Sequence, residues 1–465
     1  MRSLYTALFV LTALGPVAAS SAKRQNAPAE HWVATWATAQ PLLSTTTLPS
    51  GFGRGPGGAQ APGGAQGPGG AALPGAAQGP GGPQIGAAQT GGAQNRPPGG
   101  PGRGRTVIPP SFSDQTIRMI VHTSIGGRRV RVQFSNAFSG AEMTIGAAHV
   151  ALRSKDSATV PGSDRALTFA GKPGCVIRPG VLMLSDPVDM DVEPFADLAV
   201  SIYLPKDTGL PTNHSLAMHT TWVAKGDLTT AEAMPDSATT SRVYFWLSGV
   251  DVAAAADAYS IVALGDSITD GQGTTIDANR NWAARLAVRL AASKPTAHVA
   301  VLNEGVAGGQ VLRDLSGVSA LARFDRDVLS RAGVKWLIAF EGINDLNLHA
   351  QVDSADPLTS EDLIAGYRQM IERAHTYGIK VIGATITPAE TRLGSDNLER
   401  VRNEVNQWIR TGGAYDAVVD FDVAVRSPTH PRGLRTEFDP GDHIHITDAG
   451  NQAMADAFEL KVFGK

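Results

Sequence analysis

The chain of 465 residues contains 42% hydrophobic and 18% charged residues, a balance that is typical of a folded protein. Its 40 basic and 43 acidic side chains nearly cancel, to a formal net charge of −3, so the overall charge offers no footprint for nucleic acid or for an anionic membrane. The length suffices for two or three domains. These features exclude collagen, a coiled coil and full disorder, and they argue against a nucleic-acid partner.

Residues 1–22 have the features of a secretory signal peptide. Arg2 precedes an apolar run from Leu4 to Leu14, and small residues follow as far as Ala22. The run of about 11 residues is shorter than the roughly 20 that a bilayer-spanning helix needs, and no later stretch reaches that length. We therefore expect a secreted protein, extracellular or periplasmic, with no integral membrane segment in its mature form. The alternative is an N-terminal anchor that stays in place.

Between residues 30 and 250 the sequence predicts short strands separated by turns. Residues 128–136 and 196–205 alternate apolar with polar or small side chains, and a period of two buries one face of a strand. Further strands are expected at residues 31–39, 116–124, 143–152, 181–192 and 215–224. An antiparallel β-sandwich domain, jelly-roll-like, over residues 30–250 fits this pattern best.

Residues 51–106 interrupt this domain with a low-complexity segment. It holds 30 of the glycines and prolines, which number 52 and 29 in the whole chain, and it contains repeats such as Pro-Gly-Gly-Ala-Gln. Such a composition cannot bury enough apolar surface to fold, and each doubling of a loop's length costs only about 0.6 kcal/mol. We expect a flexible surface tether, with a segment that binds a matrix or polymer as the alternative.

Four side chains of the first domain carry predictions of their own. Cys175 is the only cysteine, so no disulfide can form within the chain, and with no His, Asp or basic neighbour in sequence it is expected to be a buried apolar residue. Asn213-His214-Ser215 is an N-glycosylation sequon, which matters only if the host glycosylates. Trp32 and Trp36 lie four apart and are expected on one face of a strand, in the core or, as the alternative, stacked on a sugar.

From residue 255 onward the pattern changes to strands that alternate with helices. Strands are predicted at residues 259–264, 298–302, 334–340, 379–383 and 417–421. Helices are predicted near residues 282–290, 319–332, 359–377, 398–408 and 447–463. Five strands with helices between them predict an α/β domain over residues 255–465, in three layers around a parallel five-stranded sheet.

Polar clusters follow several of these strands, where the ligand site of a parallel sheet lies. They are Gly265-Asp266-Ser267, Asn303 with Gly308, Gly342-Ile343-Asn344-Asp345 and, before the last helix, Asp442-His443-Ile444-His445. A serine, backbone N–H groups at glycines, an asparagine amide and an aspartate close to a histidine are the parts of an acyl-transfer site. Each cluster alone has a plainer interpretation as a turn or a cap, but together they indicate one catalytic site.

The four blocks, in this order, resemble those of the SGNH hydrolases, also called the GDSL esterase/lipase family. The resemblance covers residues 258–465 and implies a flavodoxin-like sheet, and the strand-rich part before it is similar to the sandwich that some secreted members carry. The chain departs from the pattern at two positions. Ile268 stands where leucine is frequent, and Ile446 stands where a proline often follows the histidine.

The resemblance implies a role for each catalytic residue. Ser267 is the nucleophile, His445 takes its proton and later gives it to the leaving alcohol, and Asp442 holds the imidazole. The chemistry agrees, because a serine hydroxyl needs a base and an imidazole can act as one near neutral pH. His443 competes for the base role, but only His445 stands three residues after Asp442.

The resemblance also implies an oxyanion hole, formed by the backbone N–H groups of Ser267 and Gly308 and by the side-chain amide of Asn344. Each such donor is typically worth about a hundred- to a thousandfold in rate. Asp266 and Gly342 are expected to support the site. No Gly-x-Ser-x-Gly sequence is present, so the nucleophile elbow of the α/β-hydrolases is not expected.

A metal site is the alternative use of these histidines. His443 and His445 form a His-x-His pair with His430 nearby, but no cysteine or matched set of carboxylates accompanies them. We therefore expect neither a metal nor an organic cofactor.

These observations together predict a secreted serine carboxylic-ester hydrolase that works through an acyl-enzyme. Its substrates are expected to be esters of short acyl groups, of the acetyl type, including those of carbohydrates, an expectation that rests on analogy. The alternatives are a lipase or lysophospholipase of the same family and a non-catalytic secreted carbohydrate-binding protein. The sequence fixes neither the natural ester nor the oligomeric state.

Overall fold

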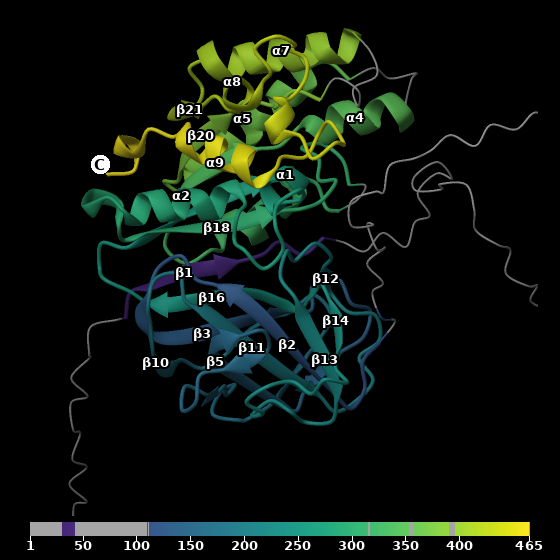
Figure 1. Ribbon diagram of the computed structural model, residues 1–465, viewed down its shortest axis with the longest axis vertical. Helices are drawn as coiled ribbons and strands as arrows, with labels where there is room; N and C mark the ends of the chain where they lie inside the picture. The colour runs from purple at the N-terminus through teal and green to yellow at the C-terminus, as the bar shows by residue number, and fades with distance from the viewer. Residues whose placement is uncertain are drawn as a thin grey trace, which may run out of the picture.

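The computed structural model describes residues 30–41, 109, 111–314, 317–352, 358–389 and 396–464, without the side chains of residues 348–352. The predicted signal peptide, residues 1–22, and the low-complexity segment, residues 51–106, lie outside the described residues. Two regions are stacked along the long axis (Figure 1). We call the described residues 30–253 the β-rich region and the described residues from 259 to 464 the α/β region.

The β-rich region consists mainly of two antiparallel sheets. One has the order β1-β16-β3-β10, with β9 also paired to β3, and the other has the order β14-β13-β2-β11-β5-β6, with β7 paired to β5. Two short ladders, β4 with β8 and β12 with β15, complete the region. The strands are β1 (Trp32–Ala37), β2 (Gln115–His122), β3 (Gly127–Ser135), β4 (Met143–Ile145), β5 (Ala147–Lys155), β6 (Ala158–Thr159), β7 (Arg165–Ala166), β8 (Cys175–Ile177), β9 (Leu182–Leu184), β10 (Val188–Val192), β11 (Asp197–Leu204), β12 (Asn213–His214), β13 (Thr221–Lys225), β14 (Thr239–Ser241), β15 (Tyr244–Phe245) and β16 (Leu247–Ala253).

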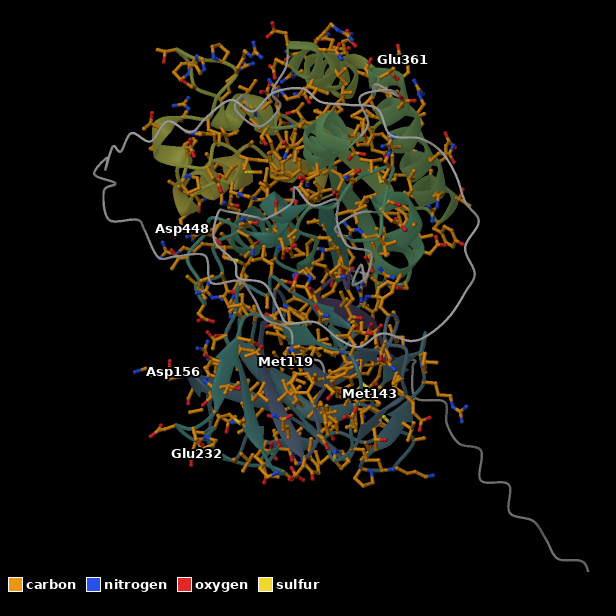
Figure 2. All side chains as sticks on the ribbon, turned by 90° about the vertical axis from the view of Figure 1, so that its right-hand side faces the viewer. Met119, Met143, Asp156, Glu232, Glu361 and Asp448 are labelled. Atoms are coloured by element: carbon orange, nitrogen blue, oxygen red, sulfur yellow. The ribbon has the colours of Figure 1, made fainter. Side chains whose placement is uncertain are left out.

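Alternation along the strands builds the core of this region. Val130 and Val132 of β3 lie in the same apolar cluster as Met119 of β2 and Val200 of β11, so the two sheets bury their apolar faces against each other. Figure 2 shows Met119 and Met143 in the interior of the region. The antiparallel strands that the alternation predicted at residues 128–136 and 196–205 are confirmed as β3 and β11.

Three predicted strands are shorter or divided. The strand expected at residues 143–152 divides at Gly146, because Ile145 pairs with Cys175 whereas Ala147 pairs with Tyr203. The strand expected at residues 181–192 divides into β9 and β10 around Pro187, whose nitrogen has no hydrogen to donate. Of residues 215–224, only those from Thr221 onward are a strand, since the preceding residues contact the α/β region instead.

The expected common face of Trp32 and Trp36 is wrong. A β-bulge between Ala34 and Trp36 shifts the register of β1 against β16, and a single extra residue exchanges the two faces of a strand. Trp36 packs against the core of the β-rich region, edge-on to Tyr244 at 5.0 Å. Trp32 lies instead under the guanidinium of Arg131, 4.5 Å from its ring centre, on the opposite face.

Two further predictions concern single residues of this region. The Asn213 side chain is buried in β12 and donates a hydrogen bond to the carbonyl oxygen of Pro211 at 3.0 Å, so the folded protein does not present this sequon for glycosylation. Cys175 is half-buried in β8, and burial raises the pKa of its thiol to about 11.

The parallel five-stranded sheet predicted for the α/β region is confirmed. Its order is β18-β17-β19-β20-β21, so the first strand has the second on one side and the third on the other, and the chain changes direction across the sheet at β17. In such sheets the ligand crevice lies at this change, outside the carboxyl ends of the strands. The strands are β17 (Tyr259–Gly265), β18 (Val299–Gly305), β19 (Val334–Phe340), β20 (Lys380–Ala384) and β21 (Ala417–Val419).

Helices cover this sheet (Figure 1). The predicted capping box of α5 is present, with Thr359 and Asp362 each bonded to the backbone of the other. No helix in the described ranges is both long and apolar enough to span a membrane. The helices are α1 (Ser267–Asp270), α2 (Trp282–Ala291), α3 (Ala320–Phe324), α4 (Ile343–Val352), α5 (Ser360–Thr376), α7 (Asp396–Thr411), α8 (Phe421–Val425) and α9 (Asp448–Asp456).

Three helix predictions need correction. The helix expected at residues 319–332 is α3 followed by a π-helical turn at Asp325–Leu329. The last helix ends at Asp456 and not at residue 463, because Phe458 turns inward and stacks on Trp282 at 5.9 Å. Residues 343–345, for which no helix was predicted, form the first turn of α4.

The two regions meet in a packed junction at β1 and β18 (Figure 1). The backbone N–H of Ala34 donates to the carbonyl oxygen of Ala332 at 3.0 Å, and the N–H of Val301 donates to the Ser124 hydroxyl at 3.1 Å. The β-rich region therefore contacts both the edge strand β18 and the segment that precedes β19.

Candidate active site

Ser267 begins a helix directly after β17. The Asp266 carboxylate caps α1 by accepting the backbone N–H of Ile268 at 2.8 Å, and Gly271 ends the helix with φ +109°. At Gly265 a Cβ atom would lie 2.5 Å from the carbonyl oxygen of Phe340, so only glycine fits where the strand passes into the helix. These local features fix Ser267 at the carboxyl end of the first strand.

His445 lies within hydrogen-bond distance of Ser267. Its Nε2 is 2.9 Å from the Ser267 hydroxyl oxygen, and its Nδ1 is 2.7 Å from Oδ2 of Asp442. Because a carboxylate oxygen can only accept, Asp442 holds the proton on Nδ1, and the lone pair of Nε2 faces the serine hydroxyl. The structure thus brings together the three residues for which catalytic roles were expected.

The charge of Asp442 follows from its contacts. Burial opposes ionisation, but hydrogen bonds from the His445 ring and from the backbone N–H groups of His445 and Ile444 outweigh it and hold the pKa of Asp442 well below its usual range. Asp442 is therefore a carboxylate at any pH at which the imidazole can act as a base.

His443 belongs to a different pair. Its Nδ1 is 2.6 Å from Oδ2 of Asp439, its side chain is 58% exposed, and its backbone is in the left-handed region at φ +62°. Within the described ranges, no three His, Cys, Asp or Glu side chains are grouped closely enough to hold a metal ion. Of the two histidines of the block, His445 is thus the one that contacts Ser267, whereas His443 contacts Asp439.

Two of the expected oxyanion donors, Gly308 and Asn344, lie on segments that are bonded to each other. Gly308 has φ +77°, which favours glycine, and the Asn344 amide donates to the carbonyl oxygen of its neighbour Gly309 at 3.0 Å. The Asp345 carboxylate accepts the backbone N–H groups of Val311 and Leu312 at 2.8 and 3.1 Å. The first turn of α4 therefore holds the loop after β18 in place.

Asn303, from the same block as Gly308, ties that loop to α1. Its amide donates to the carbonyl oxygen of Thr269 at 2.6 Å, and its Oδ1 accepts the backbone N–H of Gly305 at 2.9 Å. Three of the four sequence blocks thus meet at the ends of β17, β18 and β19.

The two residues expected to support the site have steric and electrostatic roles. Gly342 has φ +118°, and a Cβ atom there would lie 2.5 Å from the Tyr367 hydroxyl oxygen. Asp266 is buried, and burial raises its pKa to about 7. Burial likewise raises the pKa of Asp345 to about 7, although three backbone N–H groups favour its charged form.

Comparison with protein families identifies this region. Residues 261–458 match the family model described as GDSL-like lipase/acylhydrolase. The α/β region is a GDSL-type acylhydrolase domain. It is therefore a carboxylic ester hydrolase, and its substrates are esters.

Three solved structures are each similar to less than half of this chain. An enzyme from the metagenome of Lake Arreo, Spain, described as an α/β hydrolase, is 23% identical, with a TM-score of 0.35 over 45% of this chain and 96% of its own. An acetylxylan esterase from Geobacillus stearothermophilus is 20% identical, with a TM-score of 0.34 over 43% and 95%. A GDSL-like lipase from Bacteroides thetaiotaomicron is 18% identical, with a TM-score of 0.32 over 44% and 87%. A search of curated proteins found no match to this sequence.

Sequence reasoning missed a buried arginine beneath the catalytic edge of the GDSL domain. The Arg323 guanidinium donates to the carbonyl oxygens of Gly265 at 2.9 Å and Glu304 at 2.7 Å, at the carboxyl ends of β17 and β18. It also lies 3.3 Å from Asp327 and 3.4 Å from the Glu341 carboxylate. The signal in the sequence is that Glu341 directly follows the apolar strand β19 and that Glu304 stands near the end of β18, which marks them as buried acids that need a cation.

A second missed group comes from the β-rich region. His214 of β12 reaches α1 and lies 2.9 Å from the carboxylate of Asp270. The two residues are 56 positions apart in the sequence, and no motif near either of them predicts the contact. Only the fold brings this histidine to the GDSL domain.

Proposed function

We propose that the chain is a secreted serine ester hydrolase in which Ser267 is the nucleophile, His445 the general base and acid, and Asp442 the residue that orients the imidazole. One observation carries this proposal. The hydrogen bonds from the Ser267 hydroxyl to His445, at 2.9 Å, and from His445 to Asp442, at 2.7 Å, form a continuous chain. This is the arrangement that activates a serine hydroxyl.

The reaction runs in two halves. The Ser267 hydroxyl oxygen attacks the ester carbonyl carbon while Nε2 of His445 takes its proton, and the resulting tetrahedral species collapses as His445 returns the proton to the leaving alcohol. A water molecule, deprotonated in turn by His445, then attacks the acyl-enzyme and releases the acid and the free serine. Asp442 remains a carboxylate throughout and stabilises the imidazolium.

The negative charge of the tetrahedral species falls on the former carbonyl oxygen. We propose that the backbone N–H groups of Ser267 and Gly308 and the amide of Asn344 bind it. The contact from the Asn344 amide to Gly309 supports this role, because it holds the amide beside the Gly308 loop and uses only one of its two hydrogens.

We propose short acyl groups, of the acetyl type, as the preferred substrates, with carbohydrate esters among them by analogy with secreted members of the family. A long acyl chain needs an exposed apolar groove. Among the described residues, no exposed large hydrophobic side chain belongs to the four sequence blocks; the ten that exist are Val160, Val176, Val181, Leu182, Leu184, Leu210, Val288, Tyr377, Val418 and Val423.

The test of the nucleophile is Ser267→Ala, with 4-nitrophenyl acetate as substrate. We expect kcat to fall by about 10⁴-fold or more, because a serine hydrolase without its nucleophile retains only the contribution of binding and the oxyanion hole. Ser154→Ala, at an exposed serine of the β-rich region, is the matched control and should retain full activity. Turnover that survives Ser267→Ala would refute the assignment of Ser267 as the nucleophile.

The test of substrate class compares 4-nitrophenyl acetate with the octanoate ester, and measures acid release from acetylated xylan. A higher kcat/KM for the acetyl ester supports the short-acyl proposal, whereas a preference for octanoate would favour a lipase. Export is tested separately. If residues 1–22 are a cleaved signal peptide, mass spectrometry of the protein from the culture medium should find a mature chain that starts near residue 23.

A further inference from the structure

One side chain of the β-rich region contacts the helix that carries Ser267. Nε2 of His214 lies 2.9 Å from Oδ1 of Asp270, and both side chains are buried, at 3% and 7% exposure. Asp270 ends α1, which begins at Ser267 and is a single turn, closed by a hydrogen bond from the Asp270 N–H to the carbonyl oxygen of Asp266 at 2.9 Å. The positions of Ser267 and Asp270 therefore cannot vary independently.

The surroundings of His214 fix its charge. Nδ1 lies 2.7 Å from the carbonyl oxygen of Ala39, and Nε2 lies near both Asp270 and the carbonyl oxygen of Leu216. All of these oxygens can accept a hydrogen bond, an arrangement that favours a hydrogen on each ring nitrogen. Burial disfavours that charge, but the Asp270 carboxylate and the two carbonyl oxygens outweigh it and raise the pKa of His214.

The residues after His214 hold the loop that follows α1. The Asp277 carboxylate accepts the backbone N–H and the hydroxyl of Thr220, both at 2.7 Å, and its own N–H donates to the carbonyl oxygen of Met218 at 3.0 Å. Nε2 of His219 lies 2.6 Å from Oδ1 of Asn279. Asp277 and Asn279 have φ +58° and +54°, in the left-handed region that aspartate and asparagine adopt more readily than other non-glycine residues.

The same loop packs against the general base. A Cβ atom at Gly273 would lie 3.3 Å from Cβ of His445 and 2.9 Å from the carbonyl oxygen of Ile446. Further along, the backbone N–H and the hydroxyl of Thr275 donate to the Asp448 carboxylate at 2.8 and 2.7 Å. The loop thus has the β-rich region on one side and the segment that carries His445 on the other.

We propose that residues 213–220, which we call the clamp segment, are a working part of the hydrolase site, with His214 as a positioning residue that fixes Ser267 through Asp270. The inference rests on the proposed function, since it takes Ser267 as the nucleophile. It assigns the β-rich region a part in the chemistry, because neither α1 nor the loop after it is held by contacts within the GDSL domain alone.

The test is His214→Ala, assayed with 4-nitrophenyl acetate and normalised to the number of active sites titrated in the burst of nitrophenol. We expect kcat per titrated site to fall by about ten- to a hundredfold, with a much smaller change in KM, because a displacement of a reacting group by about 1 Å costs on the order of a hundredfold. The matched control is His149→Ala, which removes another histidine from a contact with an aspartate, Nδ1 to Asp164 at 2.8 Å, within the β-rich region. It should leave kcat per site unchanged.

The titration separates positioning from folding. If His214 only stabilised the fold, His214→Ala would lower the number of titratable sites and leave kcat per site at the wild-type value, and this result would overturn the inference. If the alanine variant does not fold, Asp270→Ala removes the other partner of the same contact, and the same loss of kcat per site is expected. Failure of the proposed function would appear differently, as activity that survives Ser267→Ala.

Discussion

The β-rich region and the GDSL domain bury charge in different ways. The largest buried cation of the β-rich region, Arg118, is held by neutral oxygens, among them the Ser201 hydroxyl at 2.9 Å and the carbonyl oxygen of Ala231 at 2.7 Å. In the GDSL domain, Arg323 and Arg331 face several buried acids instead. The buried arginine of the β-rich region thus bonds to neutral oxygens, whereas those of the GDSL domain lie beside carboxylates at the ends of converging strands.

This difference has an electrostatic consequence under the catalytic edge. Burial raises the pKa of Glu304 to about 8 and that of Asp266 to about 7, although Arg331 and Arg323 respectively favour their charged forms. Asp442, by contrast, is only half-buried and accepts three hydrogen bonds, which hold its pKa low. Asp442, the carboxylate that must stay charged, is thus partly exposed, whereas Asp266 and Glu304, whose pKa values are raised, are buried.

The largest expected effect tests that division of roles. Asp442→Asn should lower kcat by about 10⁴-fold, because an amide does not hold the proton on Nδ1 of His445 and the imidazole no longer presents its lone pair to Ser267. The free energy of unfolding should change far less. Initial rates and a thermal melt of the same preparation measure both, and an Asn variant with kcat within tenfold of the wild type would show that Asp442 does not orient the base.

A pair of arginine variants compares the two regions directly. Arg323→Met should lower the free energy of unfolding by about 3–5 kcal/mol, because it leaves buried carboxylates without their cation. It should also lower kcat, since Arg323 binds the carbonyl oxygens at the ends of β17 and β18. Arg118→Met should cost about 1–3 kcal/mol, because it leaves only neutral acceptors unpaired, and it should leave kcat unchanged. Denaturant titration measures the free energy of unfolding of both variants, and steady-state assays measure kcat. Equal losses of kcat would show that Arg323 is no more closely connected to the active site than Arg118.

Much of the fold could be predicted because its signals are local. Period-two alternation revealed β3 and β11, and a capping box with an apolar helical face revealed α5. Alternation is lost where a bulge intervenes, which is why the common face of Trp32 and Trp36 was wrong. The early end of α9 was missed for a similar reason, because the stacking of Phe458 on Trp282 is a contact between distant residues that no periodicity records.

In the candidate site, too, local signals could be predicted from the sequence and contacts between distant residues could not. Ser267, Gly308, Asn344 and the Asp-x-x-His block could be found because each stands in a short motif. Arg323 and His214 could not, since each acts on residues far away in the chain and its own neighbours in sequence are unremarkable in type. Motifs thus identify the groups that would react, whereas the groups that hold them emerge only when the strands are placed beside one another.

The smallest expected effect concerns the pH dependence of stability. The pKa of Asp266 is about 7 in the folded chain and near 3.8 when unfolded, so between those values the folded chain keeps a proton that the unfolded chain releases. The free energy of unfolding should therefore fall as the pH rises from about 4 to about 7. Asp266→Asn removes this titration while an amide oxygen can still cap α1, so its Tm should decline less between pH 5 and 7.5 than that of the wild type.

The control for this measurement is Asp186 of the β-rich region, whose pKa is lowered in the folded chain, whereas that of Asp266 is raised. The Thr168 hydroxyl and the backbone N–H of Gly171 lower the pKa of Asp186, so its contribution to stability is present above the unfolded value near 3.8 and is lost only in more acidic solution. Between pH 5 and 7.5 that contribution is constant, and Asp186→Asn should shift Tm equally at every pH. If Asp266→Asn also shifted Tm equally at every pH, Asp266 would carry no proton near neutral pH in the folded chain. The electrostatic difference between the two regions would then not hold at Asp266.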